Sequence, residues 1–502
     1  MNSSLNAARR RRELDEVRSD VVDVLVVGLG ATGAGAALDA ASRGLSVAAV
    51  DAHDIAFGTS RWSSKLIHGG LRYLASGQVG VAWESAVERD ALLRFTAPHL
   101  VSAHPYLLPL TPAVPRSMAA SLMAGYRLGD ALRAAARTPR HLLPGPSRLA
   151  ARRTLTLAPY LRAEGLRGGL LSWDGRVVDD ARLVVALART AAAHGARVLT
   201  RCRALALAGD GARVRDELTA EEFDIRARAV INATGVWAGE LTPSVALRPS
   251  RGTHIVLRPG ALGALHAGLH LPIPGERNRF ALVLPQADGR VYAGLTDEPL
   301  DGPIPDVPEA PESDIAFLLD VLGTALDHPL RRADVAGAFA GLRPLLDTAG
   351  APASLGGRTA DLSRRHAVLR SPDGVVTVVG GKLTTYRRMA EDAVDAACPH
   401  ARPSRTARLP LVGAGPVRPG TPGRLARRYG SEAWAVRELM REDPALAEPV
   451  ALGITRAELV WAVRHEGALD ADDLLDRRTR IGLVPEDRAA ALPAAEAALA
   501  YS

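Results

Sequence analysis

The stretch Gly28-Leu29-Gly30-Ala31-Thr32-Gly33 decides the expected fold, because it separates an apolar run from a segment of helical character. The apolar run spans residues 22–27, and the alanine-rich helical segment spans 31–43. A second apolar run at 46–50 is followed by Asp51. A strand, a glycine-rich turn, a helix and a second strand in this order are typical of a βαβ unit that binds a dinucleotide.

The residue types of this unit suit such a ligand. Gly28 permits the tight turn, Gly30 lets a pyrophosphate approach the backbone, and Gly33 lets the helix pack closely on the strand. Thr32 lies in the first turn of the helix, whose free N–H groups and positive dipole end attract phosphate. Asp51 is expected to accept hydrogen bonds from a ribose.

Two later segments favour FAD over a nicotinamide dinucleotide. Residues 230–235 form an apolar strand that ends in Ala-Thr-Gly at Gly235, a pattern common in FAD-binding sheets. Residues 378–385 indicate a strand, a double glycine and a helix start, and the junction contains Gly381, Lys382, Leu383 and Thr384. A helix N-terminus directed at the pyrimidine edge of a flavin would stabilise the negative charge that reduction places there. The sequence therefore predicts FAD as the cofactor.

The mixture of strand-like and helical segments predicts an α/β fold. We expect a doubly wound FAD-binding sheet, an interleaved antiparallel sheet for the substrate, and a small all-helical C-terminal domain. The expected divisions are a polar, solvated N-terminal extension at 1–20, the FAD-binding domain with the interleaved substrate-binding domain at 21–400, a linker rich in Pro, Gly and Arg at 401–424, and the helical domain at 425–502. In the last of these, Thr455 and Glu458 have the spacing of a capping box.

The composition argues against several classes of protein. No apolar run reaches the roughly eighteen residues that a membrane-spanning helix needs, and the first twenty residues lack the apolar core of a secretory signal. Two isolated cysteines, Cys202 and Cys398, indicate neither a metal site nor a disulfide framework, so we expect a cytoplasmic protein. The net charge of +7 is mild and aromatic residues make up 4%, which argues against nucleic-acid binding.

The basic residues are strongly biased towards arginine. Of 62 basic residues only Lys65 and Lys382 are lysines. Such a bias suggests that lysine remains where a compact ammonium is needed and a planar guanidinium will not serve. Both lysines fall inside the motifs considered next.

Residues 59–74, Thr-Ser-Arg-Trp-Ser-Ser-Lys-Leu-Ile-His-Gly-Gly-Leu-Arg-Tyr-Leu, resemble the signature of the FAD-dependent glycerol-3-phosphate dehydrogenases. Further matches are Gly341-Leu342-Arg343-Pro344-Leu345, the Gly-Gly-Lys-Leu-Thr-Thr-Tyr-Arg run at 380–387, residues 178–183 and the tail around 465–482. The resemblance implies oxidation of sn-glycerol 3-phosphate to dihydroxyacetone phosphate by hydride transfer from C2 to flavin N5. It also implies a membrane quinone as electron acceptor and a peripheral position on the inner face of the cell membrane.

The same resemblance suggests site residues. A phosphate dianion calls for guanidinium and ammonium groups, and the segments that resemble the family's substrate pocket contain Arg72, Arg343, Arg364 and Lys382. Tyr73 and His254 line that pocket by the same resemblance. The loop over FAD is expected to be formed by Thr59, Ser60, Ser63, Ser64, Lys65, His68 and Gly69.

The catalytic assignments stay open at this stage. His254 has a neutral form near physiological pH and suits the role of general base, whereas Arg343 would stabilise the developing alkoxide. The electron acceptor is equally open, because an oxidase would pass electrons to dioxygen and form peroxide. A flavin oxidase of amines or amino acids and a non-enzymatic flavin-binding scaffold are further alternatives. A homodimer is a possible assembly. Residues 116–137 form a basic amphipathic helix that either packs on its own domain or lies in a membrane interface.

Overall fold

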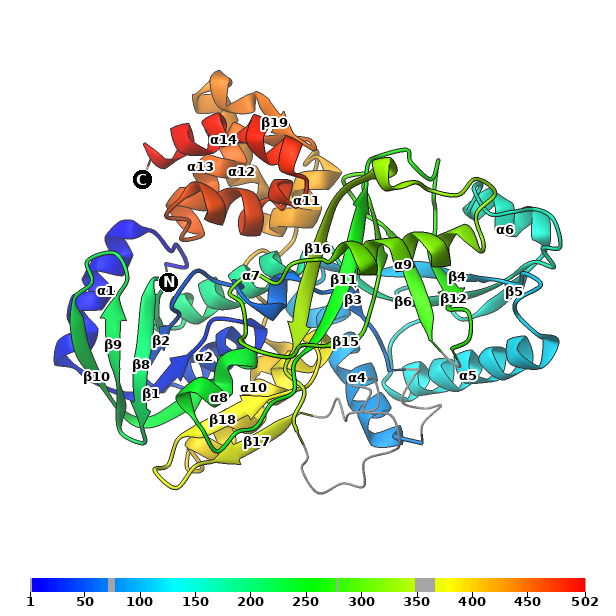
Figure 1. The fold of residues 1–502 in the computed structure, drawn as a ribbon. Coiled ribbons are helices and arrows are strands. Elements are labelled where there is room, and N and C mark those ends of the chain that lie inside the picture. Colours follow the sequence, from blue (N-terminus) through cyan, green and yellow to red (C-terminus); the bar gives the residue numbers. More distant parts are fainter. Residues whose placement is uncertain (1, 71–76, 277–278, 348–365, 502) are drawn as a thin grey trace.

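The computed structural model describes residues 2–70, 77–276, 279–347 and 366–501. Figure 1 shows two β-sheets side by side, with a helical domain above the junction between them. This architecture confirms the predicted α/β fold with two sheets and a C-terminal helical domain.

The first sheet contains the βαβ unit that the sequence predicted. Its strands run in the order β17 (Ala367–Arg370), β18 (Val376–Val379), β10 (Glu222–Asn232), β1 (Val21–Val27), β2 (Val47–Val50) and β7 (Arg197–Leu199). The strands from β18 to β7 are parallel, so their carboxyl ends meet at one edge. An antiparallel extension from β10 is formed by β9 (Gly211–Asp216) and β8 (Cys202–Ala208).

Three helices pack on the first sheet. Helix α2 (Ala31–Ser42) packs against α7 (Asp180–Ala193) and α10 (Tyr386–Ala397). Because α2 consists mainly of alanine and glycine, it lies close to its neighbours, and a Cβ at Gly35 would be 3.0 Å from the ring of Tyr386.

The second sheet is almost entirely antiparallel. Its order is β15 (Glu298–Pro299), β11 (Ser250–Leu257), β14 (Val291–Gly294), β13 (Phe280–Pro285), β12 (Gly268–Pro272), β4 (Val101–Pro109), β6 (Gly169–Val177) and β3 (Leu66–Ile67). On the other side of β11 lies β16 (Val335–Arg343), and β5 (Ser147–Leu149) pairs with β6. Helix α9 (Glu312–Gly323) contributes its apolar face to the core of this sheet.

The expectation of a solvated N-terminal extension is wrong. Residues 7–19 form helix α1 (Ala7–Ser19), which packs on the first sheet (Figure 1). Leu14 and Val17 lie three residues apart, so both face the core, and both are buried. The buried Arg10 donates to Asp216 at 2.5 Å and to the carbonyl of Thr200 at 2.7 Å. The polar composition of this segment thus conceals a packed helix, because its buried charged residues, Arg10 and Glu13, have partners inside the fold.

The amphipathic segment near residue 120 forms helix α5 (Arg116–Ala135). Several of its apolar side chains pack on its own domain: Tyr126 is buried, and Met118, Leu122 and Met123 lie partly buried against the same cluster, whereas Leu128 is 52% exposed. Within the described residues, no helix combines the length and apolar character that crossing a bilayer requires.

The C-terminal domain has its own hydrophobic core. It contains α11 (Gly423–Tyr429), α12 (Ala433–Glu442), α13 (Arg456–His465) and α14 (Pro485–Leu499), together with a short hairpin of β19 (Pro449–Ala451) and β20 (Ile454–Thr455). The predicted capping box of Thr455 and Glu458 is confirmed at the start of α13. The preceding segment, expected to be a linker, contacts the FAD-binding part, because Leu411 N donates to Thr96 O at 2.9 Å.

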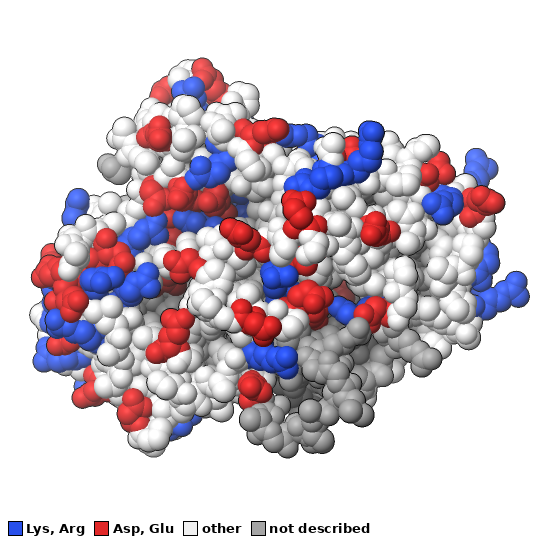
Figure 2. All heavy atoms as spheres, in the orientation of Figure 1, with Lys and Arg blue, Asp and Glu red and all other residues white. Residues whose placement is uncertain are grey.

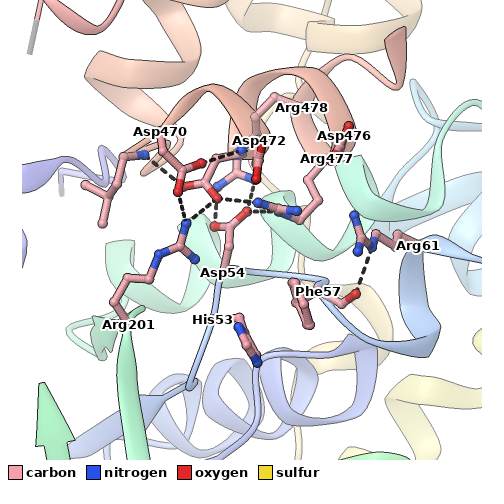
Figure 3. A network of polar contacts seen from close by, with 12 residues as sticks. His53, Asp54, Phe57, Arg61, Arg201, Asp470, Asp472, Asp476, Arg477 and Arg478 are labelled. Carbon is pink, nitrogen blue, oxygen red and sulfur yellow. Dashed lines mark hydrogen bonds and ion pairs between the residues drawn. The ribbon is translucent and has the colours of Figure 1, made fainter. Parts of the chain in front are cut away.

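Buried ion pairs attach this domain to the first sheet. On the face shown in Figure 2, acidic and basic side chains are interspersed, and both kinds gather along the junction. Figure 3 shows Arg477 and Arg478 converging on Asp54 in the loop after β2. The distances from Asp54 are 2.6 Å to Arg477 Nε and 2.7 Å to Arg478 Nη1, and all three side chains are almost fully buried.

Candidate functional site

The glycine-rich turn forms a cradle that only glycine permits. Gly28 has φ +100°, and a Cβ there would lie 2.6 Å from the carbonyl oxygen of Ala233. A Cβ at Gly33 would lie 1.8 Å from the carbonyl oxygen of Gly28. Gly30, the N-cap of α2, contributes no side-chain cap to the helix. The turn therefore brings strand, helix and neighbouring strand into contact, and Gly30 places no side chain over the N-terminus of α2, where a pyrophosphate is expected to bind.

Asp51 lies beside this turn at the end of β2. Its Oδ2 accepts from Leu29 N at 2.7 Å, and its Oδ1 accepts from His53 N at 2.8 Å. Burial nevertheless raises the pKa of Asp51 to about 6. Each carboxylate oxygen retains a further lone pair, which suits the predicted contact with ribose hydroxyls.

The ends of β10 and β18 complete the same edge. Gly235 follows β10 with φ +65° and has no atom within 4 Å of an added Cβ. Gly381 follows β18 with φ +74°, and a Cβ there would lie 2.3 Å from Met389 Sδ. Lys382 is the N-cap of the short helix η6 (Leu383–Thr385) that leads into α10. The residues present fit FAD, because glycines open the backbone at each of these strand ends and two helices begin there.

The loop that carries the family signature joins this edge to the second sheet. Thr59 Oγ1 donates to Leu342 O of β16 at 2.7 Å, and Ser60 Oγ accepts from Ala31 N of α2 at 2.8 Å. Further along, His68 N donates to Thr384 Oγ1 at 3.1 Å. The motifs at 28–33, 59–69, 341–343 and 380–385, which are distant in sequence, thus meet at one place.

Lys65 anchors the loop at residues 59–69 through its buried ammonium. Its ammonium donates to Asp180 at 2.7 Å, to Arg61 O at 3.0 Å and to Ser63 O at 3.2 Å. Ser63 Oγ also donates to Asp180, at 2.7 Å. Burial lowers the pKa of Lys65 to about 8, while Asp180 opposes that shift. All three N–H donors are engaged by the protein, so the predicted contact of Lys65 with FAD stays a prediction.

Arg343 lies at the end of β16, next to β11. Its Nη1 is 3.0 Å from Asp297 Oδ1, and its Nη2 donates to Thr296 O at 3.3 Å. Gly252 makes room for the guanidinium, because a Cβ there would lie 2.3 Å from Nη2. Asp297 therefore orients this arginine, a role that sequence reasoning did not assign to it.

His254 is buried on β11. Its ring stacks on Phe339 with centroids 4.8 Å apart, and its Nε2 shares a hydrogen bond with Ser64 Oγ at 2.9 Å. Burial, together with the nearby cations Lys65 and Arg343, lowers the pKa of His254 to about 3. The imidazole is therefore neutral, and its Nδ1 has no hydrogen-bond partner in the described part of the chain.

Lys382 reaches helix α4 (Val79–Ala91), where its ammonium donates to Ser85 Oγ at 2.7 Å. The same helix is tied to α10 by a buried pair in which Arg387 Nη2 lies 2.5 Å from Glu88. Of the remaining predicted substrate residues, Arg72, Tyr73 and Arg364 lie outside the described residues.

Sequence reasoning missed several partners of the predicted residues. Asp180, Asp297 and Ser85 hold Lys65, Arg343 and Lys382 respectively. Asp180 had a usable signal, since it lies in the motif at 178–183, and Asp297 had a weaker one, since the Thr296-Asp297 pair also resembles the family pattern. Ser85 lies in a segment whose sequence does not distinguish it.

The comparisons with known proteins agree with this geometry. A model described as "FAD dependent oxidoreductase" matches residues 23–387, and one described as "C-terminal domain of alpha-glycerophosphate oxidase" matches residues 404–501. Glycerol-3-phosphate dehydrogenase 1 of Mycobacterium tuberculosis is 54% identical over 503 residues, covering 97% of this chain and 96% of the relative. The mitochondrial glycerol-3-phosphate dehydrogenase of Arabidopsis thaliana is 35% identical, covering 94% and 81%.

Among solved structures, the glycerol-3-phosphate dehydrogenase of Bacillus halodurans complexed with FAD has a TM-score of 0.76 and 26% identity, covering 99% of this chain and 94% of that one. The L-alpha-glycerophosphate oxidase of Mycoplasma pneumoniae has a TM-score of 0.58 and 18% identity, which shows a shared fold alone. The chain belongs to the FAD-dependent oxidoreductases and, within them, to the FAD-dependent glycerol-3-phosphate dehydrogenase family.

Proposed function

We propose that the protein oxidises sn-glycerol 3-phosphate at C2 to dihydroxyacetone phosphate. The observation that carries the proposal is that the loop at 59–69 is bonded to the segment of Arg343 and to the segment of Lys382. Thr59 donates to Leu342 O, and His68 N donates to Thr384 Oγ1. These bonds support the proposal because the segments that carry Arg343 and Lys382 contact the same loop. The 54% identity to a relative named as a glycerol-3-phosphate dehydrogenase supports the same substrate.

The side chains divide the chemistry between them. Arg343, oriented by Asp297, and Lys382 provide the positive charge that a phosphate and a developing alkoxide require. Neutral His254 accepts the hydroxyl proton at Nδ1, while its bond to Ser64 fixes the ring. FAD, when bound, supplies the acceptor of the hydride that leaves C2. Burial disfavours a protonated His254 on its own. Proton transfer to His254 therefore depends on the negative charge of the substrate alkoxide that develops next to the ring.

Substrate discrimination tests this proposal. With a soluble artificial electron acceptor, we expect turnover of sn-glycerol 3-phosphate, and a kcat/KM for glycerol lower by at least about 100-fold, because glycerol forms no charge-assisted bonds with the arginine and lysine. Comparable values for the two compounds would contradict a phosphate-binding role for these side chains.

We also propose a membrane quinone as the electron acceptor. Its support is the family resemblance and one surface feature: Val79, Trp83 and Val87 of α4 are 56%, 42% and 38% exposed. These residues are four apart, so they lie along one face of the helix. Ser85, on the same helix, bonds Lys382, so an exposed apolar stripe and the candidate site share one element. We propose that this stripe contacts the inner face of the cell membrane.

Two measurements test the acceptor and the membrane contact. Reoxidation by a short-chain quinone, without stoichiometric peroxide under air, is expected, whereas stoichiometric peroxide would assign the oxidase activity instead. In co-sedimentation with anionic phospholipid vesicles, Trp83→Gln should reduce the bound fraction several-fold. Leu218→Gln, which changes a 57% exposed leucine elsewhere, is the control. Equal binding of both variants and the wild type would contradict contact through α4.

A further inference from the structure

A cavity lies where the C-terminal domain meets the two sheets. It is bordered by α11, by the turn at 286–290 between β13 and β14, and by Asp179 at the start of α7. Its volume is about 50 Å³, several times the roughly 10–15 Å³ that one water molecule needs. Lys65 alone among the predicted site residues lines it, and that ammonium is fully engaged by Asp180 and two carbonyls.

Arg480 lines this cavity and is buried without a carboxylate partner. The residue is 2% exposed, and its Nη1 donates to Asp476 O at 3.2 Å. Its Nε and Nη2 have no hydrogen-bond partner among the described residues. The guanidinium carbon lies 5.2 Å from the ring of Trp62, in the loop that carries the family signature. A buried charge with unused donors is unfavourable unless an anion meets it.

The other cations around the cavity outnumber their carboxylate partners. Arg424 and Arg428 both pair with the single carboxylate of Glu458: Arg424 Nη1 donates to Oε1 at 2.9 Å, Arg424 Nη2 donates to Oε2, and Arg428 Nε lies 3.6 Å from Oε1. Arg427 is exposed, and no carboxylate of the described chain lies within ion-pair distance of it. Arg290 is neutralised by Asp288 at 2.7 Å. The lining therefore retains a positive excess that suits a dianion.

The acidic residue Asp179 also lines the cavity. Asp179 is 2% exposed; its Oδ1 caps α7 by accepting from Ala181 N at 3.0 Å, while its Oδ2 has no partner among the described residues. A bare tetraoxyanion such as sulfate would leave this oxygen unsatisfied and would be repelled by it. Hydrogenphosphate carries one O–H group, which can donate to the carboxylate while the remaining oxygens face Arg480.

We propose that this cavity is a second anion site, separate from the reacting centre, that binds inorganic hydrogenphosphate and selects it over sulfate. Arg480 binds its oxygens, Arg427 and the pair on Glu458 provide further positive charge, and Asp179 accepts its O–H. Because Arg480 belongs to the C-terminal domain and Asp179 to the first-sheet unit, the bound anion would strengthen the contact between them.

Equilibrium dialysis of the FAD-loaded protein with labelled phosphate, at constant ionic strength, tests the proposal. Arg480→Gln is expected to weaken one class of phosphate site by about 10- to 100-fold, as loss of charge-assisted hydrogen bonds does. Exposed Arg427→Gln should weaken it several-fold and removes the concern that a buried variant misfolds. Arg441→Gln, on α12 outside the cavity, is the charge-matched control. Unchanged phosphate binding in both cavity variants would overturn the proposal.

Asp179→Asn supplies an independent test of selectivity. Asparagine caps a helix as well as aspartate does, so α7 should be preserved. We expect unlabelled sulfate to compete poorly in the wild type and as well as phosphate in the variant. Equal competition by sulfate in the wild type would contradict the role of Asp179. Phosphate bound at the reacting centre is recognised separately, because that binding depends on Arg343 and should survive Arg480→Gln and Arg427→Gln.

Discussion

Replacing Asp54 by asparagine should loosen the attachment of the C-terminal domain more than any surface change of the same chemistry. The adjacent guanidiniums of Arg478 and Arg477 hold the pKa of Asp54 well below its usual range. The substitution would leave those guanidiniums with 0% and 3% exposed side chains and no charge from Asp54. Breaking one side of a buried pair costs about 3–5 kcal/mol. Because Arg477 keeps Asp473 and Arg478 keeps the carbonyl of Glu466, we expect about 3 kcal/mol.

Urea unfolding followed by tryptophan fluorescence measures this loss. Asp472→Asn is the control, since Asp472 has a 62% exposed side chain and pairs with Arg488 at the surface, where about 0–1 kcal/mol is expected. Asp54 lies three residues after Asp51, so FAD affinity should fall in Asp54→Asn and stay unchanged in Asp472→Asn. If the free energy of unfolding falls by the same small amount in Asp54→Asn and Asp472→Asn, the reasoning about the buried ion pairs is refuted.

Three further outcomes are expected. FAD affinity should fall as the pH drops through about 6, because the carboxylate of Asp51 accepts from a ribose hydroxyl and becomes protonated below its raised pKa of about 6. Asp51→Asn should bind FAD more weakly, and its FAD affinity should no longer depend on pH in this range. Gly33→Ala should abolish FAD binding, read from flavin absorbance, because the new Cβ meets Gly28 O, whereas Gly125→Ala on α5, with open space around it, should bind FAD normally. Arg343→Lys should lower kcat/KM for glycerol 3-phosphate by about 10- to 100-fold by removing the guanidinium fork, and an unchanged value would remove Arg343 from the reaction.

Local patterns predicted the first sheet well. The turn at 28–33 and the strand ends at Gly235 and Gly381 are recognisable in the sequence, because glycine follows an apolar run at each of them. Gly28, Gly235 and Gly381 all have positive φ, which favours glycine. The alanine-rich segment expected to be helical at 31–43 corresponds to α2, which begins at Ala31 and ends at Ser42. These features depend on the backbone conformation of residues that are close together in the sequence, so a local pattern is enough to predict them.

Features that depend on distant partners could not be read in the same way. Helix α1 resembles a solvated extension until the partners of Arg10 and Glu13 are known, since Asp216 and Val198 lie about 200 residues away. The bias towards arginine draws attention to both lysines, but it does not reveal that the ammonium of Lys65 pairs with Asp180. The pairing of Asp54 with Arg477 and Arg478 likewise joins segments more than 400 residues apart.

The proposed reaction is tested most directly by the absorbance of the bound flavin in the absence of oxygen. Adding sn-glycerol 3-phosphate to the FAD-loaded protein should bleach the oxidised-flavin band and yield about one dihydroxyacetone phosphate per FAD, because the two electrons leaving C2 have no other acceptor. Glycerol at the same concentration should leave the band unchanged on that time scale. A band that persists with sn-glycerol 3-phosphate, in protein shown to contain FAD, would contradict the assigned substrate.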